Sequence, residues 1–235
     1  MPSSDYEPVF RLEGYQPASA QVAAQFRDRI ALYEADLNAL AQHHTTDGRQ
    51  SFFILHDTSA VFGLPIDMPL VALHITRDPE ARTFTFESEG LPLYALAQSW
   101  LLQRHCPASA VGRAEGSGTA PADETTIALE QRLRDHGNQF SIAMSYSGDG
   151  YPTQETAVLL KVTDRGQPQP YRLLLETTDL RTFTHQLREG AFDTADAALA
   201  WLEDRSTPMP KTRPAASQQL PVKPAGPVAA PGRAR

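Results

Sequence analysis

Cysteine is nearly absent from this 235-residue sequence, and its single cysteine, Cys106, has no second thiol for an intramolecular disulfide or a multi-cysteine zinc site. We therefore expect a reducing, cytoplasmic compartment. No apolar run approaches the ~18 residues of a membrane-spanning helix, and the first residues lack the basic stretch and apolar core of a secretory signal. A composition of 41% hydrophobic and 21% charged residues is ordinary for a globular protein, so we expect no contact with a membrane.

Acidic and aromatic residues are missing from the segment 206–235. This segment holds seven of the 19 prolines and five basic residues, although the whole chain has a net charge of -7. Such a composition buries too little apolar surface to offset about 1–2 kcal/mol of backbone entropy per ordered residue. We expect a disordered, basic, proline-rich tail after an acidic body, and an acidic body is poorly suited to binding nucleic acid.

The spacing of apolar residues predicts helices in four places. Six apolar residues from Val22 to Leu40 recur with a mean spacing of 3.6 residues, which predicts one long helix. Asp193 is a good N-cap for the last helix. The predicted helices span 18–42, 92–104, 121–136 and 193–205.

Alternation with a period of two predicts strands between these helices. Residues 51–56 are apolar on both sides, which indicates a central strand. Over 140–146 apolar residues alternate with small or polar ones, so Tyr146 is expected on the apolar face and Ser145 on the opposite, polar face, as is Glu176 in a later strand. The predicted strands span 51–56, 71–75, 82–86, 140–146, 156–162, 171–177 and 181–187.

Two short pieces of the sequence recur in the same order. The tetrapeptide at 82–85 (Arg-Thr-Phe-Thr) recurs at 181–184 with an offset of 99 residues. The pattern Trp-Leu-x-x-Arg at 100–104 recurs at 201–205 with an offset of 101, and it contains both tryptophans of the chain. We interpret these matches as an internal duplication.

The second half reads α-β-β-β-β-α, and the duplication extends this order to the first half, so the sequence predicts an α+β protein made of two tandem α-β-β-β-β-α repeats. Each repeat is expected to be an antiparallel sheet that is covered on one face by helices and open to solvent on the other. The Trp-containing helices are expected to pack against their own sheets. The predicted parts are a first lobe at 1–106, a flexible linker at 107–120, a second lobe at 121–205 and the disordered tail at 206–235.

The strongest catalytic candidate, although a weak one, is the group His56, Asp57 and Ser59 at a strand end. A Ser–His–Asp relay needs groups from separate elements that meet in space, and the sequence has no Gly-x-Ser-x-Gly turn. His56 shares a predicted strand face with apolar residues, which favours a partly buried structural histidine. We therefore assign no catalytic residue.

Other motifs also favour structural interpretations. His105 and Cys106 are adjacent at a helix C-terminus, where a thiolate is disfavoured. The seven histidines show no helical metal-binding spacing. Gly116-Ser117-Gly118 lacks the Lys-Ser/Thr ending of a phosphate-binding loop. The sequence indicates no metal site and no cofactor.

The lack of a convergent catalytic set favours a non-enzymatic protein-interaction module, such as an adaptor or a chaperone-like protein, whose partner is another protein. Two alternatives stay open. One is a hydrolase-like enzyme with a site between the lobes, and the other is a nucleic-acid-binding protein that uses strand arginines and the basic tail. The expected interaction surfaces are the Thr-rich sheet face and the tail. Their residues are Thr83, Thr85, Arg172, Thr182, Thr184, Lys211 and Arg213.

Overall fold

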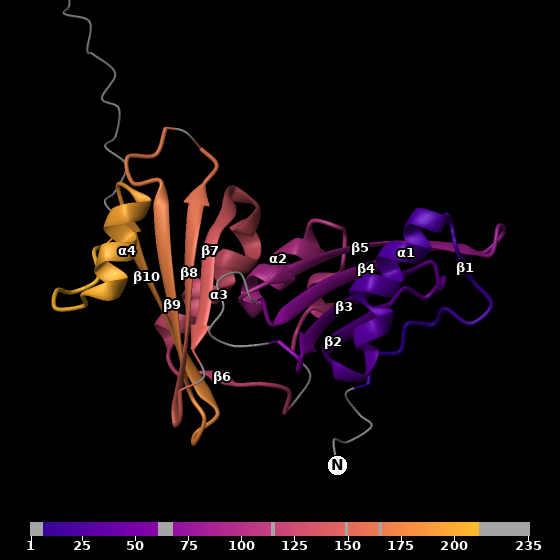
Figure 1. The fold of residues 1–235 in the computed structure, drawn as a ribbon, viewed down its shortest axis with the longest axis horizontal. Helices are drawn as coiled ribbons and strands as arrows, with labels where there is room; N and C mark the ends of the chain where they lie inside the picture. Colours follow the sequence, from indigo (N-terminus) through magenta and orange to yellow (C-terminus); the bar gives the residue numbers. More distant parts are fainter. Residues whose placement is uncertain (1–6, 61–67, 114–115, 149, 165, 212–235) are drawn as a thin grey trace, which may run out of the picture.

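The computed structural model describes residues 7–60, 68–113, 116–148, 150–164 and 166–211, and it shows two lobes of mixed α and β structure side by side (Figure 1). None of the helices in these ranges is long and apolar enough to cross a membrane. The first lobe contains β1 (Gln16–Pro17), α1 (Ala20–Arg29), β2 (Leu37–His44), β3 (Gln50–Asp57), β4 (Leu70–Asp78), β5 (Thr83–Leu91) and α2 (Tyr94–Leu102). The second lobe contains β6 (Ala120–Pro121), α3 (Glu124–His136), β7 (Phe140–Gly148), β8 (Thr153–Val162), β9 (Tyr171–Asp179), β10 (Thr184–Phe192) and α4 (Ala195–Glu203).

Each lobe contains a five-stranded mixed sheet. The strand order is β1-β5-β4-β3-β2 in the first sheet and β6-β10-β9-β8-β7 in the second. The four long strands of each sheet are antiparallel to their neighbours, whereas β1 and β6 pair in parallel with β5 and β10. The prediction of purely antiparallel sheets is therefore wrong at one edge of each sheet, because a two-residue strand is too short to show any alternation.

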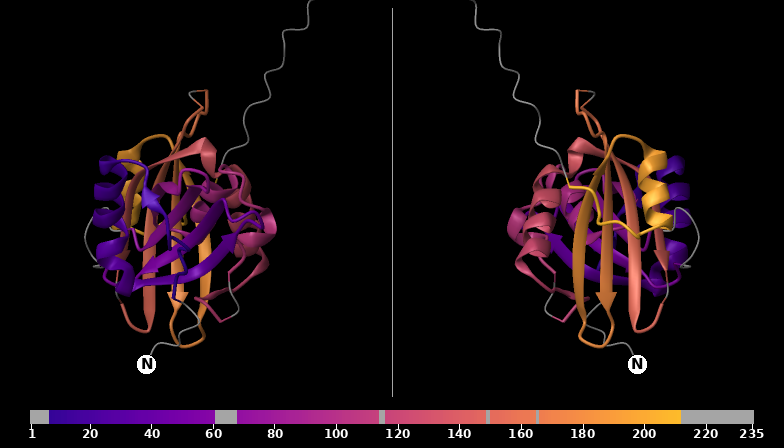
Figure 2. Two further views of the ribbon diagram at one scale, coloured as in Figure 1. Left: turned by 90° about the vertical axis from the view of Figure 1, so that its right-hand side faces the viewer. Right: turned by 90° about the vertical axis from the view of Figure 1, so that its left-hand side faces the viewer.

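Helices cover both faces of each sheet, so the prediction of helices on one face only is wrong. α1 packs on the outer face of the first sheet and α4 on the outer face of the second, while α2 and α3 contact each other between the sheets (Figures 1 and 2). The reason is visible in β3, where the four residues from Phe52 to Leu55 are all buried. Successive residues of a strand point to opposite faces, so a strand that is buried throughout needs cover on both sides.

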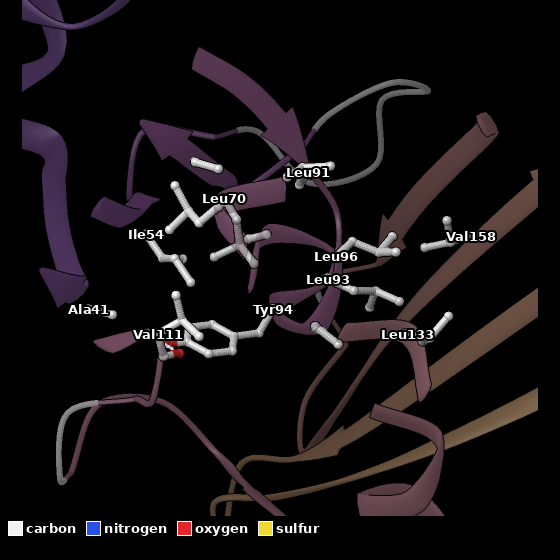
Figure 3. Close-up of a cluster of buried hydrophobic side chains, with 14 of the residues drawn as sticks. Ala41, Ile54, Leu70, Leu91, Leu93, Tyr94, Leu96, Val111, Leu133 and Val158 are labelled. Carbon is white, nitrogen blue, oxygen red and sulfur yellow. Dashed lines mark hydrogen bonds between the residues drawn. The ribbon is translucent and has the colours of Figure 1, made fainter. Parts of the chain in front are cut away.

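A shared hydrophobic core joins the two lobes. Leu93 and Leu96, at the start of α2, reach toward Val158 of β8, and Leu133 of α3 lies in the same cluster (Figure 3). Leu133 is completely buried. Burial of apolar surface stabilises by about 25 cal/mol per Å², so this layer of side chains holds the lobes together as one body.

The predicted long helix over 18–42 is wrong. α1 ends at Arg29, a 3₁₀ turn covers 31–36, and β2 begins at Leu37. Ile30 and Leu37 are buried in the same cluster under α1, so their helical spacing reflects a common core and not one continuous helix. Pairing of β2 with β3 satisfies the backbone groups that a longer helix would have satisfied internally.

A β-bulge exchanges the two faces in the second half of β7. The register with β8 shifts between Ile142 and Met144, which leaves Ala143 as an extra residue. Beyond the bulge Ser145 is buried and Tyr146 is 44% exposed. The prediction for these two residues is wrong because a one-residue insertion moves every following side chain to the other face.

The turns before β5 and β10 correspond to each other. Arg82 and Phe183 each precede their strand by one residue, and both have a φ of 52°. Pairing of these strands with β4 and β9 has the same register at an offset of 101 residues. The predicted match of Arg82 with Arg181 is therefore wrong by two residues, whereas the match of Trp100 with Trp201 has the observed offset.

The last helix begins one residue later than predicted. Thr194, and not Asp193, is the N-cap of α4, because its hydroxyl oxygen accepts a hydrogen bond of 3.1 Å from the Ala197 N–H. Threonine at this position satisfies one of the free N–H groups of the first helical turn.

After α4 the chain returns along β10. The indole N–H of Trp201 donates to the Thr207 carbonyl oxygen at 3.0 Å, and the Ala191 N–H donates to the Pro210 carbonyl oxygen at 3.0 Å. The first part of the predicted tail is therefore attached to the second sheet. Residues beyond Lys211 lie outside the described residues.

Candidate functional site

A cavity of about 400 Å³ lies where the two lobes meet the segment that connects them. Its walls come from the inner faces of both sheets, the start of α2, the connecting segment and the turn between β9 and β10. α2 lies between the two sheets in Figure 1. A cavity of this size that mixes apolar walls with a few polar groups is typical of a ligand site. The wall includes His56, Leu70, Tyr94, Arg113, Thr119, Thr156, Glu176 and Thr178.

Glu176 lies on the wall of this cavity, with no hydrogen bond or ion pair to any part of the chain that the structure describes. It lies in β9 opposite Thr156 of β8, on the same cavity wall, and its side chain is half-buried. Burial raises the pKa of the Glu176 carboxyl because the ionised form loses water; Glu130 raises it further, and His185 and Arg113 oppose the change. The sequence had suggested that Glu176 faces open solvent, and the docking of the lobes places it in the cavity instead.

His185 is held beside the cavity by both of its ring nitrogens. Its Nε2 lies 2.9 Å from the Glu130 Oε1, and its Nδ1 lies 2.9 Å from the Thr119 Oγ1. A carboxylate oxygen accepts, so Nε2–H of His185 donates to Glu130, and Nδ1 shares the second hydrogen bond with the Thr119 hydroxyl. The side chain is 1% exposed, and these contacts tie β10 to α3 and to the connecting segment.

Arg113 and Tyr94 form the part of the wall that belongs to the connection between the lobes. The Arg113 guanidinium lies 4.3 Å above the centre of the Tyr94 ring and donates to the Thr119 carbonyl oxygen. The Tyr94 hydroxyl donates to the Val111 carbonyl oxygen at 3.3 Å, and the Gln98 amide donates to the same oxygen at 2.8 Å. Burial raises the pKa of Tyr94, so its hydroxyl stays neutral.

The predicted catalytic candidates do not form a relay. His56 lies on the cavity wall, and burial lowers its pKa while Asp57 partly opposes the change. Ser59 turns to Asp57: its N–H and its hydroxyl donate to the Asp57 Oδ1 at 2.9 and 2.6 Å. Among the described residues no hydrogen bond joins the His56 ring to either group, so the serine has no histidine base.

The predicted threonine surface is divided between two sheets. Thr83 and Thr85 belong to β5 of the first sheet, and Thr184 belongs to β10 of the second. Thr182 lies in the turn before β10, where its hydroxyl is 2.8 Å from that of Thr184. The four threonines therefore form two separate surfaces on the molecule and not one.

The predicted basic contacts also differ in their surroundings. Arg172 is 8% exposed; its guanidinium donates to the Gln169 carbonyl oxygen and lies 3.9 Å from the Glu189 carboxylate. It is not on an open sheet face, so the nucleic-acid alternative loses one of its strand arginines. Lys211 is exposed, and Arg213 lies outside the described residues.

The single cysteine is not a reactive thiolate. Cys106 is buried, and burial raises its pKa to about 12. Within the described ranges no group of three or more His, Cys, Asp or Glu side chains is placed to hold a metal ion.

Sequence reasoning did not identify Glu176, His185 and Arg113 as members of one site. A usable signal existed for Glu176, since a single carboxylate ends the apolar run Leu173–Leu175. Arg113 gave no such signal, because it lies in a Gly-, Ser- and Ala-rich stretch that is typical of a linker.

Comparisons of this chain with protein-family models, with curated proteins and with solved structures find no match.

Proposed function

We propose that this protein is a non-enzymatic interaction module that binds a basic group of a partner protein in the cavity between its lobes. The observation that carries the proposal is the unpaired Glu176 carboxyl on the wall of a cavity of about 400 Å³. A lysine ammonium group beside this carboxyl supplies the positive charge that the buried, ionised form lacks.

The rest of the cavity suits a lysine side chain. Leu70, Leu180 and Phe183 line it and offer apolar surface to the aliphatic stem, while the charged end reaches Glu176. The Arg113 charge lowers the pKa of Glu176 but the two form no ion pair, since the guanidinium is stacked on a tyrosine ring and bonded to a backbone carbonyl.

Titration calorimetry with short peptides tests this proposal. Acetyl-Gly-Lys-Gly-amide is expected to bind, and replacement of lysine by norleucine is expected to weaken binding at least about tenfold, which is about 1.4 kcal/mol. Glu176→Gln should remove the preference for lysine. Glu203→Gln on α4 is the matched control, because Glu203 is exposed and lies outside the cavity. Equal binding of the two peptides, or an unchanged preference in Glu176→Gln, would contradict the proposal.

A second candidate function, a hydrolase-like enzyme with a site between the lobes, is favoured by one specific arrangement. The Thr119 hydroxyl, the His185 ring and the Glu130 carboxylate follow one another at 2.9 Å each, which is the order of nucleophile, base and orienting group. Hydrolysis of p-nitrophenyl acetate tests it. Thr119→Val should abolish a specific activity, and Thr125→Val on the exposed side of α3 should retain it. Equal rates for wild type and Thr119→Val would remove this candidate.

We also infer that the two lobes are tandem copies of one α-β-β-β-β-α unit. Three observations support this: the same strand order, the same offset of 101 residues through the last hairpin, and bulges at Ala39–Ala41 and Ile142–Met144. A relative whose two lobes agree in sequence throughout would strengthen the inference. A relative with a different strand order in one lobe would contradict it.

A further inference from the structure

The outer edge of β5 is paired only at its beginning. The Arg82 and Phe84 carbonyl oxygens accept hydrogen bonds of 2.9 Å from the N–H groups of Gln16 and Ala18. The backbone groups of Phe86, Ser88 and Gly90 point in the same direction, since they follow at steps of two. They meet no partner on this side in the part of the chain that the structure describes. Such a row of free N–H and C=O groups is a template for a further strand.

The corresponding edge of β10 is closed by the chain itself. The Leu187 N–H donates to the Thr126 hydroxyl oxygen at 3.1 Å, and the Ala191 N–H donates to the Pro210 carbonyl oxygen at 3.0 Å. Val22 takes the place of Thr126 in the first lobe, three residues after the helix N-cap, and a valine side chain accepts no hydrogen bond. The edge of β10 is therefore closed, whereas the corresponding edge of β5 is open among the described residues.

A groove of about 250 Å³ runs along the open edge, between α1 and α2. Gln25 and Arg29 line it from α1, Trp100 and Arg104 line it from α2, and residues 86–89 of β5 form its floor. Its tryptophan is the counterpart of the one that binds the returning chain in the second lobe.

The two tryptophans show the same contrast. The indole N–H of Trp201 is bonded to the Thr207 carbonyl oxygen, whereas the indole N–H of Trp100 has no partner among the described residues. Arg104 lies 3.4 Å above the Trp100 ring and donates to Glu87, so the groove has an ordered wall before anything binds in it.

We propose that residues 219–224 of the proline-rich tail dock along this groove and add a short strand to the edge of β5. Leu220 and Val222 are two residues apart, so their N–H and C=O groups point to the same side and can pair with the free groups of β5. Pro221 stands between them, where its missing N–H faces solvent, the position that proline tolerates at a sheet edge.

A precedent within the chain supports this occupant. The groove holds two carboxylates and two guanidinium groups; Glu87 is already paired with Arg104, which leaves the exposed Glu89 for one of the five basic residues of 206–235. The segment Thr207–Pro210, which also contains two prolines, already closes the equivalent edge of the second sheet.

Amide hydrogen exchange of the full-length protein, measured by NMR, tests the proposal. The N–H groups of Phe86, Ser88 and Gly90 are expected to exchange slowly in the wild type, and Val222→Asp should accelerate them at least about tenfold. The Trp100 indole N–H signal should shift in the same variant. The Trp201 indole N–H signal should stay unchanged as an internal control.

Val228→Asp is the matched control, because Val228 also follows a proline in the tail but has no apolar residue two positions before it. Slow exchange in the wild type and in Val228→Asp, with fast exchange only in Val222→Asp, supports docking of 219–224. Fast exchange at the three amides in the wild type would overturn it. So would protection that arises only after another protein is added, which would assign the edge to a separate partner.

Discussion

The imidazole ring of His74 is stacked on the ring of Phe52, with the ring centres 4.5 Å apart and the planes 3° from parallel. The two residues are directly opposite each other on β4 and β3, on the inner face of the first sheet. Burial lowers the pKa of His74, Arg104 and His105 lower it further, and Glu87 opposes the change. His74 is thus one of three described histidines, with His44 and His56, whose pKa burial lowers.

His44 should make the folded protein sensitive to acid. Burial, together with Arg11, Arg77 and His43, lowers its pKa from 6.5 to about 4. As the pH falls, His44 therefore binds a proton in the unfolded chain before it does so in the folded protein. The contribution of neutral His44 to the free energy of unfolding is complete above pH 6.5 and is lost progressively toward pH 4. Urea denaturation at pH 7, 6 and 5 should show a smaller loss of stability for His44→Gln than for wild type.

His136→Gln is the control for this experiment, since His136 is exposed at the end of α3. It should lose stability with acid as the wild type does. If His44→Gln and His136→Gln follow the same curve, the acid sensitivity does not come from His44.

Glu176 should have the opposite effect to His44: it should make the folded protein less stable as the pH rises. Its pKa is raised by burial, so the folded state holds the proton more tightly, and stability decreases as the pH rises through the unfolded value toward the folded value. Glu176→Gln should be more stable than wild type at pH 7 and equal to it near pH 4. Each unit of difference between the two pKa values corresponds to about 1.4 kcal/mol.

Urea midpoints of Glu176→Gln and Glu203→Gln across this pH range provide the measurement. Glu203 is exposed, and its variant should follow the wild type. A Glu176→Gln variant that gains nothing at pH 7 would show that the carboxyl is well solvated in the cavity.

Leu133 should report on the core that the lobes share. It is completely buried, and Leu133→Ala should cost about 2–5 kcal/mol of unfolding free energy through lost contacts and a cavity. Ile127→Ala on the same helix should change it by about 0.5 kcal/mol or less, since Ile127 is 44% exposed. Because the core spans both lobes, tryptophan fluorescence and circular dichroism should give one common transition, and separate transitions would contradict the shared core.

Thr126 should be important for the closed edge of β10. Its hydroxyl oxygen is the acceptor for the Leu187 N–H, and the side chain is completely buried. Thr126→Val keeps the shape but leaves this N–H unsatisfied, at a cost of about 1–3 kcal/mol. Thr125→Val, on an exposed position beside it, should be nearly neutral in the same denaturation experiment. Equal stability of the two variants would mean that water replaces the lost acceptor.

Much of the secondary structure could be predicted from local patterns. The run from Glu124 to His136 has an acidic start and a basic end, which favour a helix in any context, and α3 forms there. Asp78 before Pro79 marks the turn between β4 and β5, because an aspartate and a proline favour a turn wherever they occur. Each of these elements is decided by residues that are near one another in the chain.

The elements that were predicted wrongly depend on distant partners. The residues from Ile30 to Leu40 have a helical spacing, yet β2 forms because β3 is available to pair with it. Nothing near Ser145 in the sequence indicates the bulge that buries it, since a bulge is defined by its partner strand. Local spacing describes which residues are apolar, and it does not say which surface covers them.

The sequence by itself determined the mixed α and β composition, the two similar halves and the basic, proline-rich composition of 206–235, because these follow from residue type and local order. Only the tertiary structure decided that the halves pack around α2 and α3, and that Glu176 and Arg113 line one cavity with His185 beside it. Those residues belong to segments far apart in the chain. Their common environment comes from burial between the lobes, a property of the packed fold that no single segment carries.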